Sequence, residues 1–533
     1  MKRLCAVFVA SFILLFAASA AFAATAPKIT WDSPDMSWKK DTSPVKLSIY
    51  IDYSWYGSDV WGKDDISPLI EKATGVSLDV TKGTDPNQIQ VLVAGGKLPD
   101  LVFCDIPATL FQRPEVSYSY NELIQKYAPE LMDLIDPLEV LNNTMEDGKF
   151  YSLRSHYTTQ ADWDNPLMIT GVGTSAFHVR KDILNTLGIK SIAKVEDIPG
   201  IFAQVKAKYP DLSVYGNRSG SQPIVMSWMG LGYNMLDVSG GNVNISFFSL
   251  KDRWLEYYKL MNGMFQKGYF TRETWTLPYA QTKQIAQSGK MFSMTANCPA
   301  SDEINTVAAQ NKDALRFTPI YPPPTYKGKV LYSPLDMSIG WACLFITKNC
   351  SKPDRAIRFA EYLKSPEGQR LSQWGVEGVH YQLAGGGLLR LLDRSLKPTQ
   401  AENGLGLWYF EASSMNESVK QVSLKISAPD FSTQVDLMQA MKPYFMRNPA
   451  LYRAVNPEGN SDAAKIKAKV NDIFRKADIE MMCTTSATQI DQLYNKMLED
   501  MKAANYGVFE KYLKDMYAKD KKKYDDYAAS VKK

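Results

Sequence analysis

The sequence predicts an α/β protein with more than one lobe. Near the N-terminal end, strand-like and helix-like segments alternate in the order β-α-β-α-β, which is typical of a parallel sheet covered by helices. The chain has 533 residues, more than one hydrophobic core usually serves, so two or more lobes are expected. With 45% hydrophobic and 22% charged residues, the composition is that of a soluble globular protein.

The first 23 residues show the three parts of a secretory signal peptide. The basic start MKR precedes the apolar run LCAVFVASFILLFAASA, and AFA ends at Ala23 with the small-x-small pattern of a cleavage site. No cysteine lies there to carry a lipid anchor, and no later segment is long and apolar enough to span a membrane. The sequence therefore predicts export to the periplasm or the medium, with residues 24–44 as a linker.

Charge and cysteine usage exclude two classes of function. The net charge of +4 falls to about +2 when Lys2 and Arg3 leave with the signal peptide, so nothing points to nucleic acid, which usually requires a concentrated basic patch. The remaining cysteines fit no zinc pattern, and their odd number leaves at least one free thiol. We expect small buried side chains, with one disulfide still open as an alternative. They are Cys104, Cys298, Cys343, Cys350 and Cys483.

The first lobe is predicted from five consecutive segments after the linker. VKLSIYIDY (45–53) alternates apolar and polar residues and reads as a strand. DISPLIEKATGV follows as a helix that has Pro68 in its first turn and ends at Gly75. SLDVTKG, NQIQVLVAGG and DLVFCD continue as strand, helix and strand. Ligands of such sheets bind outside the carboxyl ends of the strands, where Asp105 and the loop 53–56 are expected to meet.

The same alternation resumes further along the chain. TSAFHVRKDILNTLGI (174–189) reads as strand then helix, and KVEDIPGIFAQVKAKYP and KDRWLEYYKLMNGMFQKGYF read as helices. GKMFSMTAN and IGWACLFITKN are predicted strands, and SKPDRAIRFAEYLKSPEG is a predicted helix. Residues 400–533 are expected to be mainly helical.

Several of these segments resemble, in order, bacterial extracellular solute-binding proteins of family 1, the carbohydrate receptors of ABC importers. The opening stretch DISPLIEKATGVSLDV…NQIQVLVAGGKLPDLVFCD carries the resemblance first. HVRKDILNTLGI, SGKMFSM and FITKNCSKPDRAIRFAEYLKSPEGQRL continue it, and WGVEGVHY resembles a loop of the longer, lipoprotein-like subgroup. The matching segments run from about residue 65 to residue 381.

The resemblance implies a two-lobed periplasmic-binding-protein fold (type II-like) with discontinuous lobes. Lobe 1 would comprise residues 45–170 with 343–400, and lobe 2 residues 174–338 with 401–533. Crossover hinge segments are placed near Met168–Ala176 and Asp336–Trp341. A monomer of this kind would bind a carbohydrate, most simply an oligosaccharide, in the interlobe cleft by hinge closure. It would then deliver the ligand to permease subunits in the inner membrane.

The resemblance does not extend to a metal site. Related alginate-binding proteins carry a calcium loop after the second-lobe helix, but here that place holds YPDLSVYGNRSG. This stretch lacks the alternating Asp and Asn ligands that calcium requires. We therefore expect no metal and no cofactor.

Sugar binding needs flat aromatic faces for C–H groups and polar side chains for hydroxyls. Position in the predicted lobes selects nine candidates, each with an ordinary alternative. Asp105 could instead cap a helix, Trp228 could pack in a core, and Trp275 could lie on the surface. The candidate ligand-binding residues are Trp55, Asp105, Trp163, Trp228, Trp275, Asn297, Trp341, Glu377 and Tyr381.

No enzyme signature stands out in the sequence. The histidines His156, His178 and His380 show no metal-binding spacing, and no G-x-S-x-G elbow or phosphate loop is present. Asp162 and Asp164 flank Trp163, as glycosidase carboxylates might be imagined to do, but such pairs are common in loops. An exported glycan-active enzyme and a receptor for a non-sugar solute such as a peptide stay open as alternatives.

Overall fold

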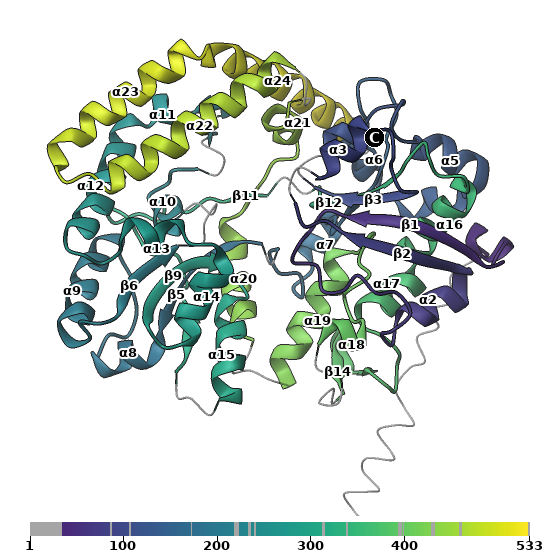
Figure 1. Cartoon of the computed structure of the whole chain (residues 1–533), viewed down its shortest axis with the longest axis horizontal. Helices are drawn as coiled ribbons and strands as arrows, with labels where there is room; N and C mark the ends of the chain where they lie inside the picture. The colour runs from purple at the N-terminus through teal and green to yellow at the C-terminus, as the bar shows by residue number, and fades with distance from the viewer. Residues whose placement is uncertain are drawn as a thin grey trace, which may run out of the picture. The chain divides into compact units, whose positions relative to one another are not determined.

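The computed structural model divides the chain into two compact units, each assembled from distant segments (Figure 1). Unit 1 comprises Met1–Asp105, Pro114–Ser155 and Ala342–Ser427, and unit 2 comprises Ile106–Arg113, His156–Trp341 and Ala428–Lys533. The structure describes residues 35–85, 88–105, 108–171, 173–217, 223–232, 236–238, 241–311, 315–336, 339–392, 397, 399–427, 432–457 and 461–530. The predicted signal peptide and residues 24–34 of the predicted linker lie outside these ranges.

Unit 1 is built on a five-stranded mixed sheet in the order β2-β1-β3-β12-β4. β1 pairs in parallel with β2 and with β3, as the β-α-β-α-β pattern predicts. β12 pairs antiparallel with both β3 and β4. All five residues of β12 are buried, so this late strand lies inside the sheet. The strands are β1 (Val45–Ile51), β2 (Val76–Lys82), β3 (Leu101–Cys104), β4 (Arg154–Ser155) and β12 (Ala342–Ile346).

Helices cover the sheet of unit 1 and follow the predicted order. α2 ends at Gly75, whose φ of 71° is left-handed, and a Cβ there would lie 2.1 Å from the backbone oxygen of Thr42. Glycine is therefore required for this close approach of two chain segments. The helices of this unit include α2 (Ser67–Thr74), α3 (Gln88–Ala94), α5 (Tyr120–Tyr127), α6 (Pro137–Asn143), α16 (Pro353–Lys364), α17 (Pro366–Gln373) and α19 (Ser414–Ser427).

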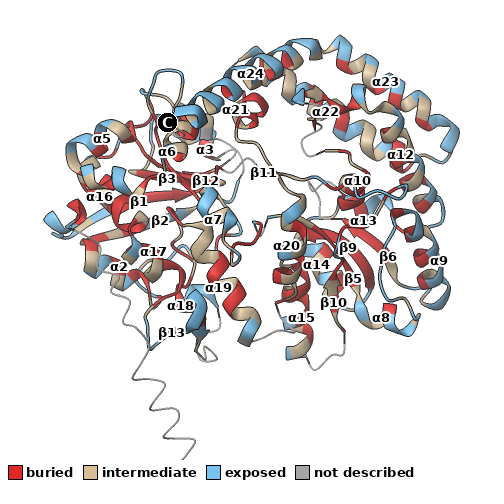
Figure 2. Cartoon of the chain, turned by 180° about the vertical axis from the view of Figure 1, so that it is seen from behind, coloured by how far each residue is buried: buried red, intermediate tan, exposed pale blue. Residues whose placement is uncertain are grey.

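Unit 2 contains a four-stranded sheet in the order β10-β5-β9-β6. β9 is central, antiparallel to β5 and parallel to β6, and six of its seven residues are buried. In Figure 2 the buried residues concentrate on the strands of both sheets. The strands are β5 (Ser175–Arg180), β6 (Ser213–Asn217), β9 (Met291–Asn297) and β10 (Phe317–Pro319), and the surrounding helices include α8 (Lys181–Thr186), α9 (Ile198–Lys208), α12 (Lys251–Gln266), α14 (Tyr279–Gln287), α15 (Ala300–Gln310) and α20 (Thr433–Met441).

The C-terminal part of unit 2 is helical, as predicted. α22 packs on α12, α23 and α24, and α24 also packs on α21. Arg453 of α21 and Asp520 of α24 form a largely buried ion pair that fastens the last helix. These helices are α21 (Leu451–Val455), α22 (Asp462–Met482), α23 (Ile490–Ala503) and α24 (Tyr506–Ser530). No helix of the described chain is both long and apolar enough to cross a bilayer.

The boundaries of the units differ from the predicted lobes in three places. The chain leaves unit 1 after Ser155, earlier than the expected 168–176, and a short excursion at residues 106–113 belongs to unit 2. Residues 401–427, expected in lobe 2, belong to unit 1. Their apolar side chains explain this, since Trp408 and Phe410 are fully buried against Tyr56 of unit 1. The second boundary, after Trp341, falls within the expected range.

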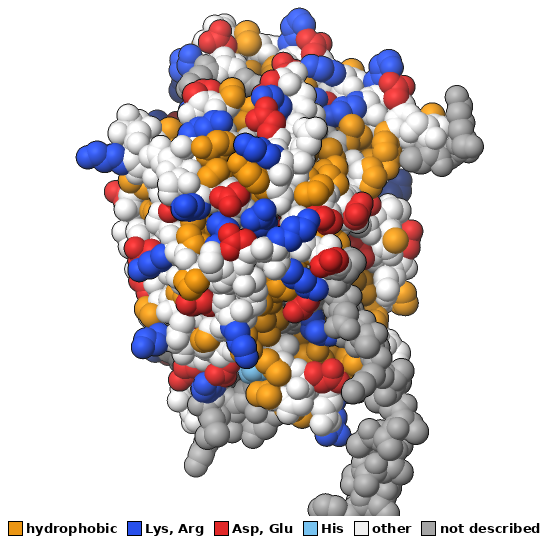
Figure 3. All heavy atoms as spheres, turned by 90° about the vertical axis from the view of Figure 1, so that its right-hand side faces the viewer, with side chains coloured by type: hydrophobic (Ala, Val, Ile, Leu, Met, Phe, Trp, Pro, Cys, Tyr) orange, Lys and Arg blue, Asp and Glu red, His pale blue; other side chains and the backbone are white. Residues whose placement is uncertain are grey.

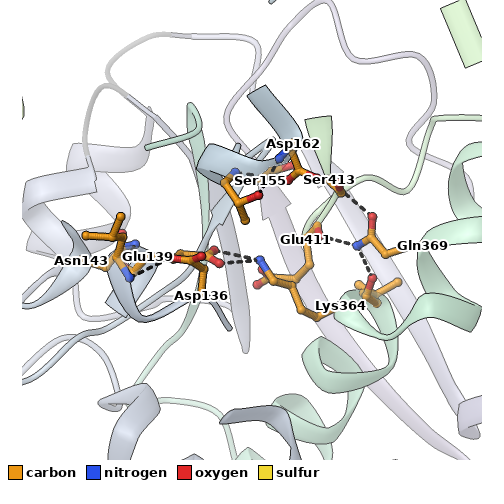
Figure 4. A network of polar contacts seen from close by, with 12 residues as sticks. Asp136, Glu139, Asn143, Ser155, Asp162, Lys364, Gln369, Glu411 and Ser413 are labelled. Carbon is orange, nitrogen blue, oxygen red and sulfur yellow. Dashed lines mark hydrogen bonds and ion pairs between the residues drawn. The ribbon is translucent and has the colours of Figure 1, made fainter. Parts of the chain in front are cut away.

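A buried polar network lies in unit 1 between α6, α16 and the segment before α19 (Figure 4). Lys364 binds both carboxylate oxygens of Glu139 at 2.8 and 2.9 Å, and Glu139 is only 1% exposed. Glu411, also 1% exposed, has no hydrogen-bond partner for either carboxylate oxygen in the described structure. Burial therefore raises the pKa of Glu411 to about 8, although the nearby Lys364 lowers it in part. Near neutral pH this carboxyl group is protonated in the fold.

Glu411→Gln is expected to flatten the pH dependence of stability. The folded pKa of Glu411 is about 8 against an ordinary 4.5, so its favourable contribution is complete below about pH 4.5 and is lost as the pH rises to 8. At pH 8 the free energy of unfolding of the glutamine variant should exceed that of the wild type by about 2 kcal/mol or more. Urea unfolding between pH 5 and pH 9, with the exposed Glu377→Gln as control, measures this. Parallel pH profiles for wild type and Glu411→Gln would contradict it.

Candidate functional site

An exposed aromatic pair follows the first strand of unit 1. Trp55 is 62% exposed, and its ring lies 4.9 Å from that of Tyr53 at an interplanar angle of 31°. Tyr53 in turn meets Phe103 of β3 edge-on at 5.8 Å. The indole of Trp55 is thus an accessible flat surface supported from beneath by the carboxyl ends of β1 and β3.

Asp105 follows β3 at the same end of the sheet. Its Oδ1 lies 3.9 Å from Nη1 of Arg154, whose side chain is only 2% exposed, whereas that of Asp105 is 44% exposed. Burial raises the pKa of Asp105, and the charge of Arg154 opposes the rise. The carboxylate therefore balances a buried guanidinium, while the side chain is also partly exposed to solvent. Helix capping involves residues 106–107, which lie outside the described ranges.

In unit 2, Trp341 lies at the end of a crossover segment beside His156. The Nε1 of Trp341 donates a hydrogen bond to Nδ1 of His156 at 3.1 Å, and the two ring centroids are 6.1 Å apart. His156 has a φ of 62°, a left-handed conformation that is uncommon for a residue with a side chain. Such strained residues concentrate at functional sites, and here the residue directly follows β4.

Trp163 lies in the short helix α7 (Gln160–Asp164), which is fixed by a capping box between Thr159 and Asp162. Two cations face its ring, the guanidinium of Arg447 at 4.9 Å and the ammonium of Lys442 at 5.3 Å from the centroid. Arg447 is paired with Asp336 at 3.5 Å, and burial lowers the pKa of Arg447. The two cations stabilise the indole, so less of its surface is available than at Trp55.

Three of the predicted site residues are core residues instead. Trp228 is fully buried and meets Phe177 of β5 edge-on. Trp275 is 4% exposed and packs on Phe270, and Tyr381 is fully buried against Trp374. These side chains offer a ligand no accessible face, because each is buried in the core of its unit.

The other two predicted residues occupy intermediate positions. Asn297 ends β9, and its backbone oxygen is 3.0 Å from Nε2 of the buried His178. Glu377 is exposed and forms a β-bridge with Tyr381. Sequence reasoning missed Arg154, His156, Lys442 and Arg447. Only the His156–Trp341 pairing had a usable signal, since both residues flank strands of the same sheet.

His178 has a structural role in unit 2. His178 is buried, its Nδ1 lies 2.6 Å from Oγ of Ser301, and burial lowers its pKa to about 4. It is therefore neutral and ties β5 to β9 and α15. In the described ranges no group of three or more His, Cys, Asp or Glu residues could hold a metal ion. On the face of the molecule in Figure 3, basic and acidic side chains are interspersed.

The fold is that of substrate-binding proteins of ABC transporters. The alginate-binding protein AlgQ2, solved without calcium ion, shares 16% identity with a TM-score of 0.67 over 89% of this chain and 98% of its own. FusA of S. pneumoniae in complex with kestose has 15% identity and a TM-score of 0.67 over 91% and 100%. An HMO-binding, ABC-transporter-associated solute-binding protein from Bifidobacterium longum infantis shares 14% identity with a TM-score of 0.60 over 90% of this chain and 99% of its own. No protein-family model and no curated protein matches the sequence. The two-lobed fold predicted from the sequence is confirmed.

Asp105→Asn is expected to change the stability of unit 1 only slightly at pH 7. The change removes the attraction to the buried guanidinium of Arg154, but it also relieves the cost of burying the carboxylate, and that cost is the larger because the pKa of Asp105 is raised on balance. The net effect should stay below about 1 kcal/mol, since Asp105 is partly exposed. Urea unfolding at pH 7 measures it, with the exposed Asp59→Asn in the neighbouring loop as the charge-matched control. A clearly larger loss of stability in Asp105→Asn than in Asp59→Asn would show that the pairing with Arg154 outweighs the cost of burial.

Proposed function

We propose that this protein is an extracytoplasmic receptor that binds a carbohydrate, most simply an oligosaccharide, and delivers it to the permease of an ABC importer. The single observation that carries the proposal is the exposed Trp55–Tyr53 pair at the carboxyl ends of parallel strands, in a chain with the substrate-binding-protein fold. This is the edge of an α/β sheet at which ligands bind.

The chemistry of the pair suits a sugar ring. One face of a pyranose carries axial C–H groups, which pack on an aromatic face, and its hydroxyls require hydrogen-bonding groups close by. The partly exposed carboxylate of Asp105 can accept hydrogen bonds from such hydroxyls, and a charged acceptor makes hydrogen bonds worth about 1.5–3 kcal/mol each. Trp55 would supply an apolar contact surface for the sugar ring, and Asp105 would fix the orientation of the ring through its hydroxyls.

Unit 2 would contribute the second set of contacts. Trp341, held by His156, and Trp163 are the aromatic candidates there, and Asn297 is a candidate with weaker support. Glu377, which belongs to unit 1, also remains a proposal with weaker support. Trp228, Trp275 and Tyr381 are not proposed, because they are buried. Closure of the two units on a hinge would then enclose the ligand.

The structural neighbours favour a binding protein over an enzyme. AlgQ2 is described as alginate-binding, and FusA as an ABC-transporter substrate-binding protein. Export by the predicted signal peptide, a permease partner and a monomeric state fit that role and are part of the proposal.

A screen that follows the fate of the ligand tests the function. The purified chain should show a saturable rise in melting temperature with at least one oligosaccharide, because the native state alone binds it. The sugar should be recovered unchanged, with no new reducing ends after prolonged incubation. New reducing ends would indicate a glycan-active enzyme instead. A response to peptides alone would indicate a non-sugar receptor.

Substitution of Trp55 tests the binding surface itself. Trp55→Ala should weaken the affinity for the oligosaccharide found in the screen by about tenfold or more, with Trp55→Phe intermediate, since the lost contact is aromatic area. The melting temperature without ligand should stay unchanged, because the side chain is 62% exposed. Calorimetric titration measures the affinity, with the similarly exposed Val91→Ala as control. Unaltered affinity in Trp55→Ala would exclude this surface.

A further inference from the structure

A small cavity lies in the C-terminal part of unit 2, apart from the aromatic residues described above. Its volume is about 80 Å³, and its apolar walls come from four elements: the hairpin of β7 (Leu236–Asp237) and β8 (Asn244–Ile245), α21, α22 and α24. Leu236, Ile245, Val455, Val470 and Phe509 provide these walls. A cavity of about 150 Å³ takes up benzene, so this one has room for a molecule of about three carbons.

Two polar side chains also line the cavity, and both come from α22. Lys467 and Asn471 are four residues apart, so they lie on the same face of the helix. They give one side of an otherwise apolar space a donor and an acceptor. This combination differs from a simple packing defect, which is lined by apolar groups alone.

Lys467 is a cation without an ionic partner. Its Nζ donates to the backbone oxygen of Val455, and no ion pair joins it to any described residue. Burial lowers its pKa. An ammonium group has three donors, so two remain for a ligand. Lys467 is partly buried, and a charge removed from water is costly unless it is paired, so an anionic ligand would relieve part of this cost.

Asn471 offers an acceptor that no described donor satisfies. Its Oδ1 is buried and has no hydrogen-bond partner among the described residues. An acceptor in this position calls for a donor from the ligand. A ligand that satisfies both residues therefore carries an acceptor of negative charge and a hydroxyl group next to it.

We propose that this cavity binds a short 2-hydroxycarboxylate of about three carbons. The carboxylate would accept hydrogen bonds from Nζ of Lys467, and the hydroxyl would donate to Oδ1 of Asn471. The methyl group would contact Val470 and Phe509. Because the walls come from α21, α22, α24 and the β7–β8 hairpin, occupancy would link these elements and stabilise the helical part of unit 2.

The test uses the full chain and three probes of similar size. L-lactate offers both groups, propionate lacks the hydroxyl, and 1,2-propanediol lacks the carboxylate; sodium chloride controls for ionic strength. L-lactate should raise the melting temperature saturably by about 2 °C or more. Propionate should require an about tenfold higher concentration for the same rise in melting temperature. The diol and the salt should have no saturable effect. Deuterium exchange should slow in α21, α22 and α24 when L-lactate is bound.

Two matched variants locate the effect. Lys467→Met keeps the length of the side chain and removes the charge, and it should abolish the response to L-lactate. Lys465→Met removes the same charge from a side chain of the same helix that is 63% exposed, and it should keep the response. The proposal is overturned if L-lactate raises the melting temperature no more than propionate or salt, or raises it equally in Lys467→Met. The cavity would then hold ordered water only. If Lys467→Met does not fold, the comparison of the three probes on the wild type still decides.

Discussion

The pairing of β12 with β3 is the contact on which the rest of unit 1 depends. Cys343 to Ile346 pair antiparallel with Leu101 to Cys104, and the other edge of β12 holds β4. Without β12, the backbone groups of β3 would form an open edge in a buried sheet, where unpaired polar groups are costly. β12 follows the whole sheet of unit 2 in the chain. Its pairing with β3 therefore returns the chain to unit 1 after residues 156–341. It also fixes the positions of Arg154 and of the adjacent Trp341.

The charges of unit 1 are distributed so that few remain uncompensated in its interior. Arg154 is balanced by Asp105, and Lys364 by Glu139. Glu411 has no such partner and retains its proton instead, which is the less costly state for an unpaired buried carboxyl group. Asp105 differs from these residues because it reaches solvent. The same pair therefore contributes to the stability of the sheet and presents an acceptor at the edge of the sheet where a ligand is proposed.

Local patterns in the sequence predicted the elements well, whereas the direction of single side chains was not predictable. β1, β5 and β9 form where strands were predicted, because alternation and β-branched residues are local properties. Trp228 and Trp275 were selected for their surroundings in sequence, but packing across the sheet of unit 2 buries them. The role of Arg154 could not be predicted, since its partner is 49 residues away. Residues 401–427 were misplaced because helix content alone does not reveal which core a helix joins.

The five described cysteines give the native state a particular relation to its redox surroundings. All are buried and none forms a disulfide, and Cys104 lies opposite Cys343 in the β3–β12 pair. Burial raises the pKa of each of these two thiols, which suppresses the reactive thiolate. Their oxidation is therefore a hazard of the unfolded chain rather than of the folded protein. Once β12 has docked, the fold shields these five thiols from oxidants, and no disulfide between them adds to its stability.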